Sequence, residues 1–195
     1  MVSVLLQNYL TETVDVLIAT AIEHKEKSSD ERKLLLHDAI QSSCVIKPTP
    51  TSIPGLVIYK NFLTLEKSRM LFDTIDKYPW NTELSRRTQH YGYKYTYTRP
   101  NLIEKTTKMP KILEDIADSL HENKIVGSPL NQCIVNEYEP GQCIGAHTDS
   151  PIFGEYICSI SLGSNIEMEF SRGDHITKVL LNIGSLIVLS GEARH

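Results

Sequence analysis

The chain has 195 residues, 41% of them hydrophobic and 23% charged, which is typical of a soluble globular protein that buries a core. Its formal net charge of −4 excludes a global electrostatic signal for nucleic acid or for a membrane surface, so any such signal has to be local. Every apolar run is too short or too interrupted by charge to span a bilayer, and we therefore expect no membrane association.

Four cysteines contain no C-x-x-C pair and lie mostly within apolar, strand-like runs: Cys44, Cys133, Cys143 and Cys158. Free cysteine in such runs is typical of a reduced protein core, whereas disulfides persist in oxidising compartments. We interpret all four as reduced core residues and expect a cytoplasmic or nuclear protein.

The first 43 residues predict two helices. Apolar side chains recur at near-helical spacing over residues 4–18, and a second helix follows a polar break at residues 27–30. Prolines between residues 48 and 54 then form a linker that cannot continue a helix. We predict a helical extension over residues 1–46 that packs on a main domain over residues 54–195; a partner-docking role is an alternative that no residue favours.

The first half of the main domain predicts one strand and two helices. The strand covers residues 56–59, and Thr64 is the expected N-cap of a helix that runs to about Asp76. A second helix is expected over residues 108–122. The apolar side chains expected to face the core are Leu65, Met70, Leu71 and Ile75 in the first helix and Ile112, Leu113, Ile116 and Leu120 in the second.

From Gln132 onward the sequence consists of short apolar runs divided by glycine, proline, asparagine and aspartate. The predicted strands are residues 133–138, 143–147, 156–162, 166–170, 176–181 and 185–189. Short strands at close spacing after several helices indicate an α+β fold. We predict a double-stranded β-helix, or jelly roll, with N-terminal and flanking helices.

His147 and Asp149 are the candidate metal ligands. At the end of a strand, residues i and i+2 point to the same face, so both side chains could reach one ion. Two histidines and one carboxylate on one face of an octahedron leave three positions for a keto acid and O₂, which suits Fe(II). Without further context, however, an H-x-D triplet is more often a surface turn.

The surrounding residues supply that context. Residues 136–149, NEYEPGQCIGAHTD, resemble throughout the pattern N-x-Y-x-x-G-x-x-I-x-x-H-x-D of the AlkB family of Fe(II)/2-oxoglutarate-dependent dioxygenases. Residues 160–164 and 184–194 resemble the V-S-L-G-x strand and the closing G-S-L/D…R segment of the same family. The resemblance implies a jelly roll that holds Fe(II) through His147 and Asp149, with 2-oxoglutarate against Asn136 and Tyr138. It implies no catalytic side chain beyond the metal ligands.

The third iron ligand is not assigned by the resemblance. In the family, the second metal histidine follows the arginine that matches Arg194, and an arginine that binds the far carboxylate of 2-oxoglutarate comes later still. This chain ends at His195, whose distance from Asp149 makes it an alternative third ligand. We therefore expect a C-terminally incomplete chain in which iron binding and activity are weakened or lost.

A basic and aromatic segment precedes the predicted jelly roll. Residues 81–111 contain seven Lys and Arg against two acids, and tyrosines are interleaved with them. This composition fits phosphate contacts and base stacking, although alternating tyrosine also makes an ordinary edge strand. The run R-x-x-Q-H-Y-G-Y resembles the nucleotide-recognition lid of AlkB relatives. The residues expected on the substrate side are Arg87, Gln89, His90, Tyr91 and Tyr93.

The leading functional hypothesis is oxidative demethylation or hydroxylation of modified bases in DNA or RNA, as in DNA repair or RNA modification. Such enzymes act on single-stranded or flipped bases. A catalytically inactive nucleic-acid- or protein-binding module on the same fold is a second hypothesis. A dioxygenase acting on a protein or a small molecule is a third. The sequence does not decide among DNA, RNA and protein, and it leaves the oligomeric state open.

Overall fold

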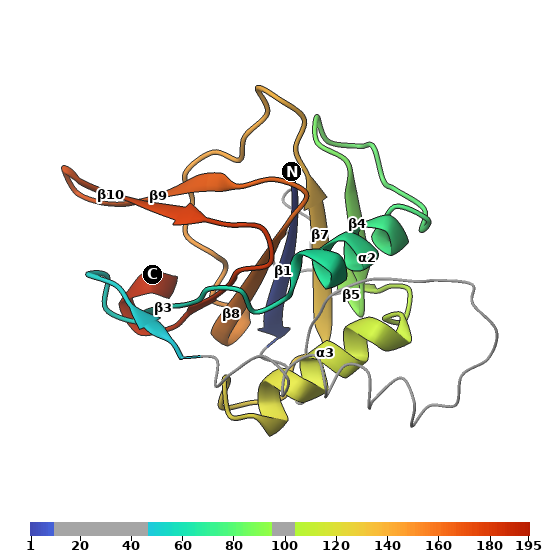
Figure 1. Cartoon of the computed structure of the whole chain (residues 1–195), viewed down its shortest axis with the longest axis horizontal. Helices are drawn as coiled ribbons and strands as arrows, with labels where there is room; N and C mark the ends of the chain where they lie inside the picture. Colours follow the sequence, from blue (N-terminus) through green and yellow to red (C-terminus); the bar gives the residue numbers. More distant parts are fainter. Residues whose placement is uncertain (10–46, 95–103) are drawn as a thin grey trace.

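The computed structural model describes residues 1–9, 47–94 and 104–195 (Figure 1). A seven-stranded sheet forms its centre, and each hydrogen-bonded pair of neighbours is antiparallel. In spatial order the strands are β2 (Thr49–Pro50), β3 (Leu56–Tyr59), β11 (Leu186–Leu189), β8 (Phe153–Leu162), β1 (Val2–Tyr9), β7 (Gln132–Glu137) and β4 (Thr88–Tyr91).

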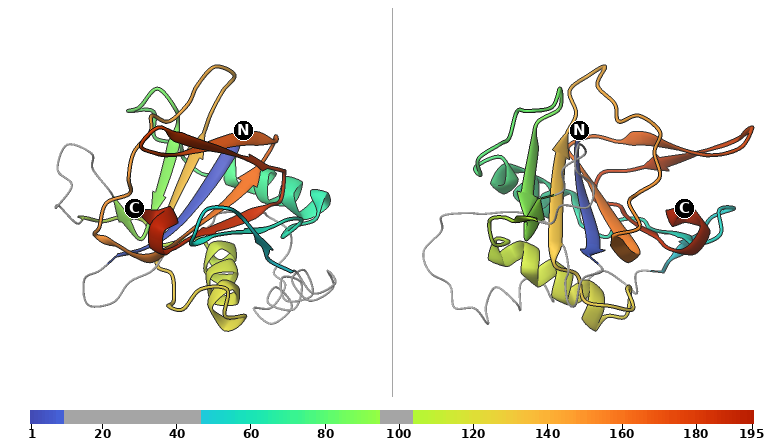
Figure 2. Two further views of the ribbon diagram at one scale, coloured as in Figure 1. Left: turned by 90° about the vertical axis from the view of Figure 1, so that its left-hand side faces the viewer. Right: turned by 180° about the vertical axis from the view of Figure 1, so that it is seen from behind.

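Smaller elements surround this sheet (Figure 2). Two two-stranded sheets are formed by β9 (Ile166–Arg172) with β10 (His175–Leu181), and by β5 (Tyr93–Lys94) with β6 (Glu104–Lys105). The helices among the described residues are α2 (Leu65–Ile75), α3 (Lys111–Glu122) and a 3₁₀ turn, η1 (Gly191–Arg194). The predicted strands and helices of the main domain are thus confirmed to within a few residues, apart from residues 143–147.

The core lies on both faces of the large sheet because side chains alternate along each strand. On one face, Cys158, Ile160 and Leu162 of β8 pack with the buried sides of α2 and α3. On the other face, Ile157 of β8 packs with residues of β3, β11 and the β9–β10 hairpin, including Val179. Two antiparallel layers flanked by helices make an α+β jelly-roll arrangement, and the described strands do not close into a barrel.

In helix α2, a capping hydrogen bond fixes the start of the helix, and packing against the sheet determines which side chains are buried. Thr64 is its N-cap, and the Oγ1 atom of Thr64 accepts the backbone N–H of Lys67 at 3.2 Å, as predicted. The prediction that Leu65 and Met70 are buried was wrong, since they are 72% and 51% exposed. Met70 lies about 100° around the helix from the buried Leu71, and Leu65 is in the exposed first turn.

The N-terminal residues differ from the predicted helix. Residues 2–9 form β1, which lies in the middle of the large sheet and pairs with both β7 and β8. A short apolar run does not distinguish helix from strand by its spacing, and here two neighbouring strands satisfy its backbone groups. The rest of the predicted helical extension, residues 10–46, lies outside the described residues, so the division into two domains stays a prediction.

The described cysteines are free, but they are not all in the core. Cys133 and Cys158 are buried as predicted, whereas Cys143 is exposed because its segment is a surface loop rather than a strand. Cys44 lies outside the described residues. Among the helices that the structure describes, none is long and apolar enough to cross a membrane.

Candidate metal centre

His147 and Asp149 lie close together on the loop between β7 and β8. The His147 Nε2 and Asp149 Oδ1 atoms are 3.7 Å apart. Residues 142–150 have no regular secondary structure, so the strand predicted over residues 143–147 was wrong. The alternation of a strand therefore does not bring the two side chains together; the path of an irregular loop does.

The backbone orients the His147 ring. Its Nδ1 atom is 2.8 Å from the Gly145 carbonyl oxygen, and a carbonyl only accepts, so Nδ1 carries the proton. Nε2 is left facing Asp149, and a neutral ring with this tautomer presents its lone pair there. The hydrogen bond to Asp149 raises the pKa of His147, while partial burial opposes that change.

The pair fits a single metal ion. Metal–nitrogen and metal–oxygen bonds of ~2.1 Å allow one ion to contact two atoms as much as about 4.2 Å apart, and the observed separation is shorter. One imidazole and one carboxylate are also part of the donor set that Fe(II) oxygenases use.

A third protein ligand does not join this pair within the residues that the structure describes. No group of three His, Cys, Asp or Glu side chains capable of holding a metal is found there. His195 is exposed after η1, and its backbone N–H donates to the Glu192 carbonyl oxygen at 3.3 Å. His195 does not join the pair in this arrangement, and its assignment as the third ligand stays a prediction.

Asn136 and Tyr138, expected beside 2-oxoglutarate, lie at the end of β7 and immediately after it. Asn136 is only 5% exposed, and its side-chain oxygen accepts a hydrogen bond from the Arg86 Nε atom at 2.9 Å. The Arg86 guanidinium carbon lies 5.8 Å from the centre of the Tyr138 ring. Arg86 also stands close enough to His147 to lower its pKa, against the larger raising effect of Asp149. Arg86 therefore lies near both the predicted pair and the candidate metal ligands.

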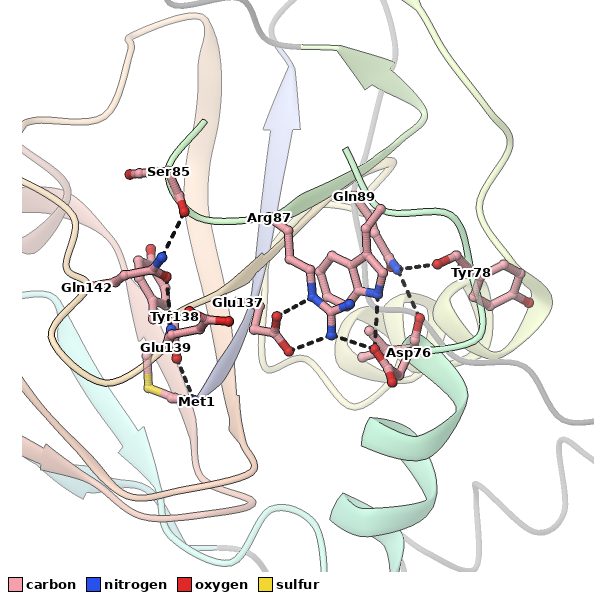
Figure 3. Close-up of polar contacts among 12 residues, drawn as sticks. Met1, Asp76, Tyr78, Ser85, Arg87, Gln89, Glu137, Tyr138, Glu139 and Gln142 are labelled. Atoms are coloured by element: carbon pink, nitrogen blue, oxygen red, sulfur yellow. Dashed lines mark hydrogen bonds and ion pairs between the residues drawn. The ribbon is translucent and has the colours of Figure 1, made fainter. Parts of the chain in front are cut away.

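Sequence reasoning missed Arg86 as a site residue. The run R-x-x-Q-H-Y-G-Y begins at Arg86, but the prediction took the adjacent Arg87 as the substrate-side residue. Gln142 was missed as well. Its side-chain amide donates to the Ser85 carbonyl oxygen at 2.7 Å and accepts the Glu139 N–H at 2.9 Å (Figure 3). Gln142 therefore ties the segment that carries Arg86 to the loop that carries the metal ligands.

Two of the predicted substrate residues are buried and hold the fold together instead. Gln89 and Tyr91 are 3% and 5% exposed. The Gln89 amide donates to the carbonyl oxygens of Ile75 and Tyr78 at 2.9 and 3.2 Å, and its oxygen accepts the Tyr91 hydroxyl at 3.1 Å. The expectation that these two side chains face substrate is corrected, because all of these polar contacts are internal.

Arg87 is held between the end of α2 and β7 (Figure 3). It donates to Asp76 Oδ1 at 2.6 Å and forms a bidentate pair with Glu137. Its guanidinium carbon also lies 4.3 Å from the centre of the Trp80 ring. The hydrogen bond to Glu137 is the main reason that the pKa of Arg87 is raised. A phosphate at this position would have to compete with two carboxylates.

His90 and Tyr93 are the remaining two predicted substrate residues, and both are half-buried. The His90 Nδ1 atom is buried without a hydrogen-bond partner among the described residues. Burial lowers the pKa of His90 to about 4, and the positive charge of Lys94 adds to this effect. His90 is therefore neutral at physiological pH.

A shallow cavity of about 460 Å³ opens on the Arg87 side of this region, and neither His147 nor Asp149 is among its lining residues. Figure 3 shows most of the side chains that line it. They are Met1, Phe72, Arg87, Glu137, Tyr138, Glu139 and Pro140.

The sequence model of the 2OG-Fe(II) oxygenase superfamily matches residues 81–195. The tRNA (carboxymethyluridine(34)-5-O)-methyltransferase alkbh8 of Xenopus tropicalis is 31% identical over 180 residues, which cover 85% of this chain and 28% of that protein. Uncharacterized protein L905 of Acanthamoeba polyphaga mimivirus is 30% identical, covering 74% of this chain and 71% of that protein. The Alpha-ketoglutarate-dependent dioxygenase AlkB of Escherichia coli is 29% identical over 115 residues, 55% of this chain and 52% of the enzyme.

The extent of these matches differs. This chain spans little more than a quarter of the Xenopus protein but more than two thirds of the viral one. The family match includes the loop with His147 and Asp149, the residues around Arg86 and the whole β8–η1 region. The chain therefore belongs to the 2OG-Fe(II) oxygenase superfamily, as an AlkB-like member.

Proposed function

We propose that this chain carries the site of a Fe(II)/2-oxoglutarate-dependent dioxygenase that demethylates or hydroxylates modified bases in DNA or RNA. The observation that carries the proposal is the His147–Asp149 pair, 3.7 Å apart with the imidazole fixed by Gly145. Family membership supports the cofactor, and the Escherichia coli relative is named for the same co-substrate. The tRNA methyltransferase name of the Xenopus relative favours a nucleic-acid substrate.

The first role that the proposal assigns to residues of this chain is to hold the metal ion. His147 Nε2 and Asp149 would hold Fe(II), with the Gly145 carbonyl keeping the ring in the required tautomer. When bound, Fe(II) with 2-oxoglutarate and O₂ supplies the oxidation, in which the keto acid becomes succinate and CO₂ and one oxygen atom enters a C–H bond of the substrate. A hydroxylated N-methyl group then collapses to release an aldehyde.

Arg86, Asn136 and Tyr138 would receive the keto acid. A guanidinium binds carboxylates through charge-assisted hydrogen bonds, and amide and phenol groups donate to keto-acid oxygens. Arg86 contacts Asn136 and lies over Tyr138, so the three groups stand together. His90 and Tyr93 remain the substrate-side candidates, whereas Gln89 and Tyr91 position the strand that carries them.

The test is a titration with Mn(II), a redox-stable substitute for Fe(II), combined with succinate production on methylated oligonucleotides. His147→Ala should abolish both metal binding and succinate formation. His175→Ala is the matched control, because His175 is an exposed histidine at the start of β10, and it should behave like the wild type. Metal binding that survives His147→Ala, or a wild type that makes no succinate in the presence of methylated bases, contradicts the proposal.

A catalytically inactive nucleic-acid-binding module is the second candidate. The observation that favours it is that no third protein ligand joins His147 and Asp149 among the described residues. Such a module would bind oligonucleotides without binding Mn(II), and His147→Ala would leave the oligonucleotide affinity unchanged. The Mn(II) titration, together with an oligonucleotide titration, therefore separates the candidates.

A further inference from the structure

Arg194 is a buried cation that makes four hydrogen bonds to the end of one loop and the start of the strand that follows it. It is 3% exposed and lies at the end of η1. Its Nε atom donates to the Gly154 carbonyl at 2.8 Å, and its Nη atoms donate to the carbonyls of Asp149, Ser150 and Phe153 at 3.3, 2.8 and 2.7 Å. All four acceptors belong to the segment that runs from the metal ligand Asp149 into β8.

This segment needs an external support. Residues 142–150 have no helix or sheet of their own, so their carbonyl groups have no ladder to bond to. A planar guanidinium with five donors can satisfy several carbonyls that curve around it, which a single ammonium group cannot do. Burial lowers the pKa of Arg194, and the negative charge of Asp149 partly opposes this effect.

The other side of η1 is anchored to the turn before β3. The Ala193 N–H donates to the Pro54 carbonyl at 3.0 Å, and the N–H and hydroxyl of Ser190 donate to the Gly55 carbonyl at 2.9 and 3.1 Å. Gly55 has φ +84°, and a Cβ atom there would lie 1.9 Å from the Ser190 carbonyl oxygen. A continuous set of contacts therefore runs from this turn through η1 and Arg194 to the backbone of Asp149.

We propose that Arg194 is a positioning residue for the metal centre. It fixes the backbone of Asp149 and the three acceptors after it, so that the Asp149 carboxylate stays within reach of the ion held by His147. The inference rests on the proposed function, because it assigns Arg194 a role at that same site. A positioning residue differs from a merely structural one. Loss of a structural residue would lower stability without changing the metal environment.

The experiment is Arg194→Lys in the full chain, which keeps the charge but removes the planar set of donors. We expect Mn(II) to bind about 10- to 100-fold more weakly, as is typical when an outer partner of a metal ligand is lost. The visible absorption spectrum of the Co(II)-substituted protein should change too, because it reports ligand geometry. Arg172→Lys is the matched control, since Arg172 is exposed and pairs with Glu192 of the same turn; both readouts should stay at wild-type values.

The outcomes separate this inference from the proposed function. If the wild type binds no Mn(II), both are overturned. If the wild type binds Mn(II), and Arg194→Lys binds it equally well with the same Co(II) spectrum, only the role of Arg194 is overturned. Should Arg194→Lys fail to fold, Ser190→Ala carries the test, because it removes one bond to Gly55 and leaves Arg194 in place. Its Mn(II) affinity should fall below that of the wild type, and an unchanged affinity overturns the inference.

Discussion

At the scale of single residues, the environment of a side chain decides its role more than its type does. Arg86 and Arg87 are adjacent and chemically identical, yet Arg86 contacts Asn136 beside the metal ligands while Arg87 is bound by Asp76 and Glu137. Cys143 and Cys158 differ in the same way, since one is on a surface loop and the other is in the core. These differences arise from which strand or loop lies opposite each side chain.

His90 gives a prediction about pH at this scale. Burial, helped by Lys94, lowers the pKa of His90 in the folded protein to about 4, below its ordinary value of 6.5. Between these two values the unfolded chain binds the proton and the folded protein does not. The contribution of His90 to stability is therefore complete above about pH 6.5 and is lost as the pH falls toward 4.

The measurement is urea unfolding of the wild type and of His90→Asn at pH 7 and pH 5. The free energy of unfolding of the wild type should fall by on the order of 1–2 kcal/mol more than that of the variant over this interval. Parallel pH dependence of the two proteins would show that His90 is not neutral and buried as described.

At the scale of elements, the hydrogen bonds of one side chain, Gln89, join β4 to the end of α2. Gln89 of β4 donates to the carbonyls of Ile75 and Tyr78 at the end of the helix, where the last carbonyls have no partner further along the helix itself. Helix α2 in turn carries Asp76, which binds Arg87, so the position of this helix end influences the side chains along β4.

We expect Gln89→Leu to lower the free energy of unfolding by about 1–3 kcal/mol, because it removes a buried amide that donates to two carbonyls. Tyr91→Phe is the matched control, since it removes only the hydroxyl that donates to Gln89, and it should cost less. Chemical denaturation measures both. If Gln89→Leu kept full stability but lost affinity for an oligonucleotide, the substrate role first expected for Gln89 would be restored.

At the scale of the whole molecule, the local excess of positive charge in residues 81–111 is largely balanced by the fold. Within the described part of this segment, four basic side chains form ion pairs with carboxylates. The pairs are Arg87 with Asp76 and Glu137, Lys94 with Glu83, Lys108 with Glu114, and Lys111 with Asp115. Glu114 and Asp115 belong to α3. Such pairs reduce the number of cations that can release counterions from nucleic acid. Arg86 and the exposed Lys105 are the other two described cations of the segment.

Binding to single-stranded RNA should therefore depend only weakly on salt. Each phosphate contact is expected to contribute about 0.7 to the slope of log K against log salt. Because Arg86 is held by Asn136, one contact through Lys105 predicts a slope of about −0.7 from this segment. Fluorescence anisotropy of a labelled oligonucleotide at several salt concentrations measures it, and Lys105→Ala should reduce the slope by about 0.7. A slope steeper than about −4 would mean that the paired side chains also contact phosphate.

The sequence by itself determined the main strands and helices after residue 54, the His147–Asp149 pair and the family. These features depend on contiguous residues, on the spacing of apolar side chains and on a motif read in order along the chain. The order of residues 136–149 was enough to single out the candidate ligands, which the structure brings close together even though the strand predicted to carry His147 is a loop.

Only the tertiary structure decided the rest. Residues 2–9 are a strand because β7 and β8 lie on both sides of them, and a short apolar run is compatible with helix or strand until its neighbours are known. Gln89 and Tyr91 face the interior, and Arg194 reaches the carbonyls around Asp149, because segments distant in sequence meet there. Burial and hydrogen-bond partners depend on these long-range contacts, and the spacing of residues along the chain does not contain them.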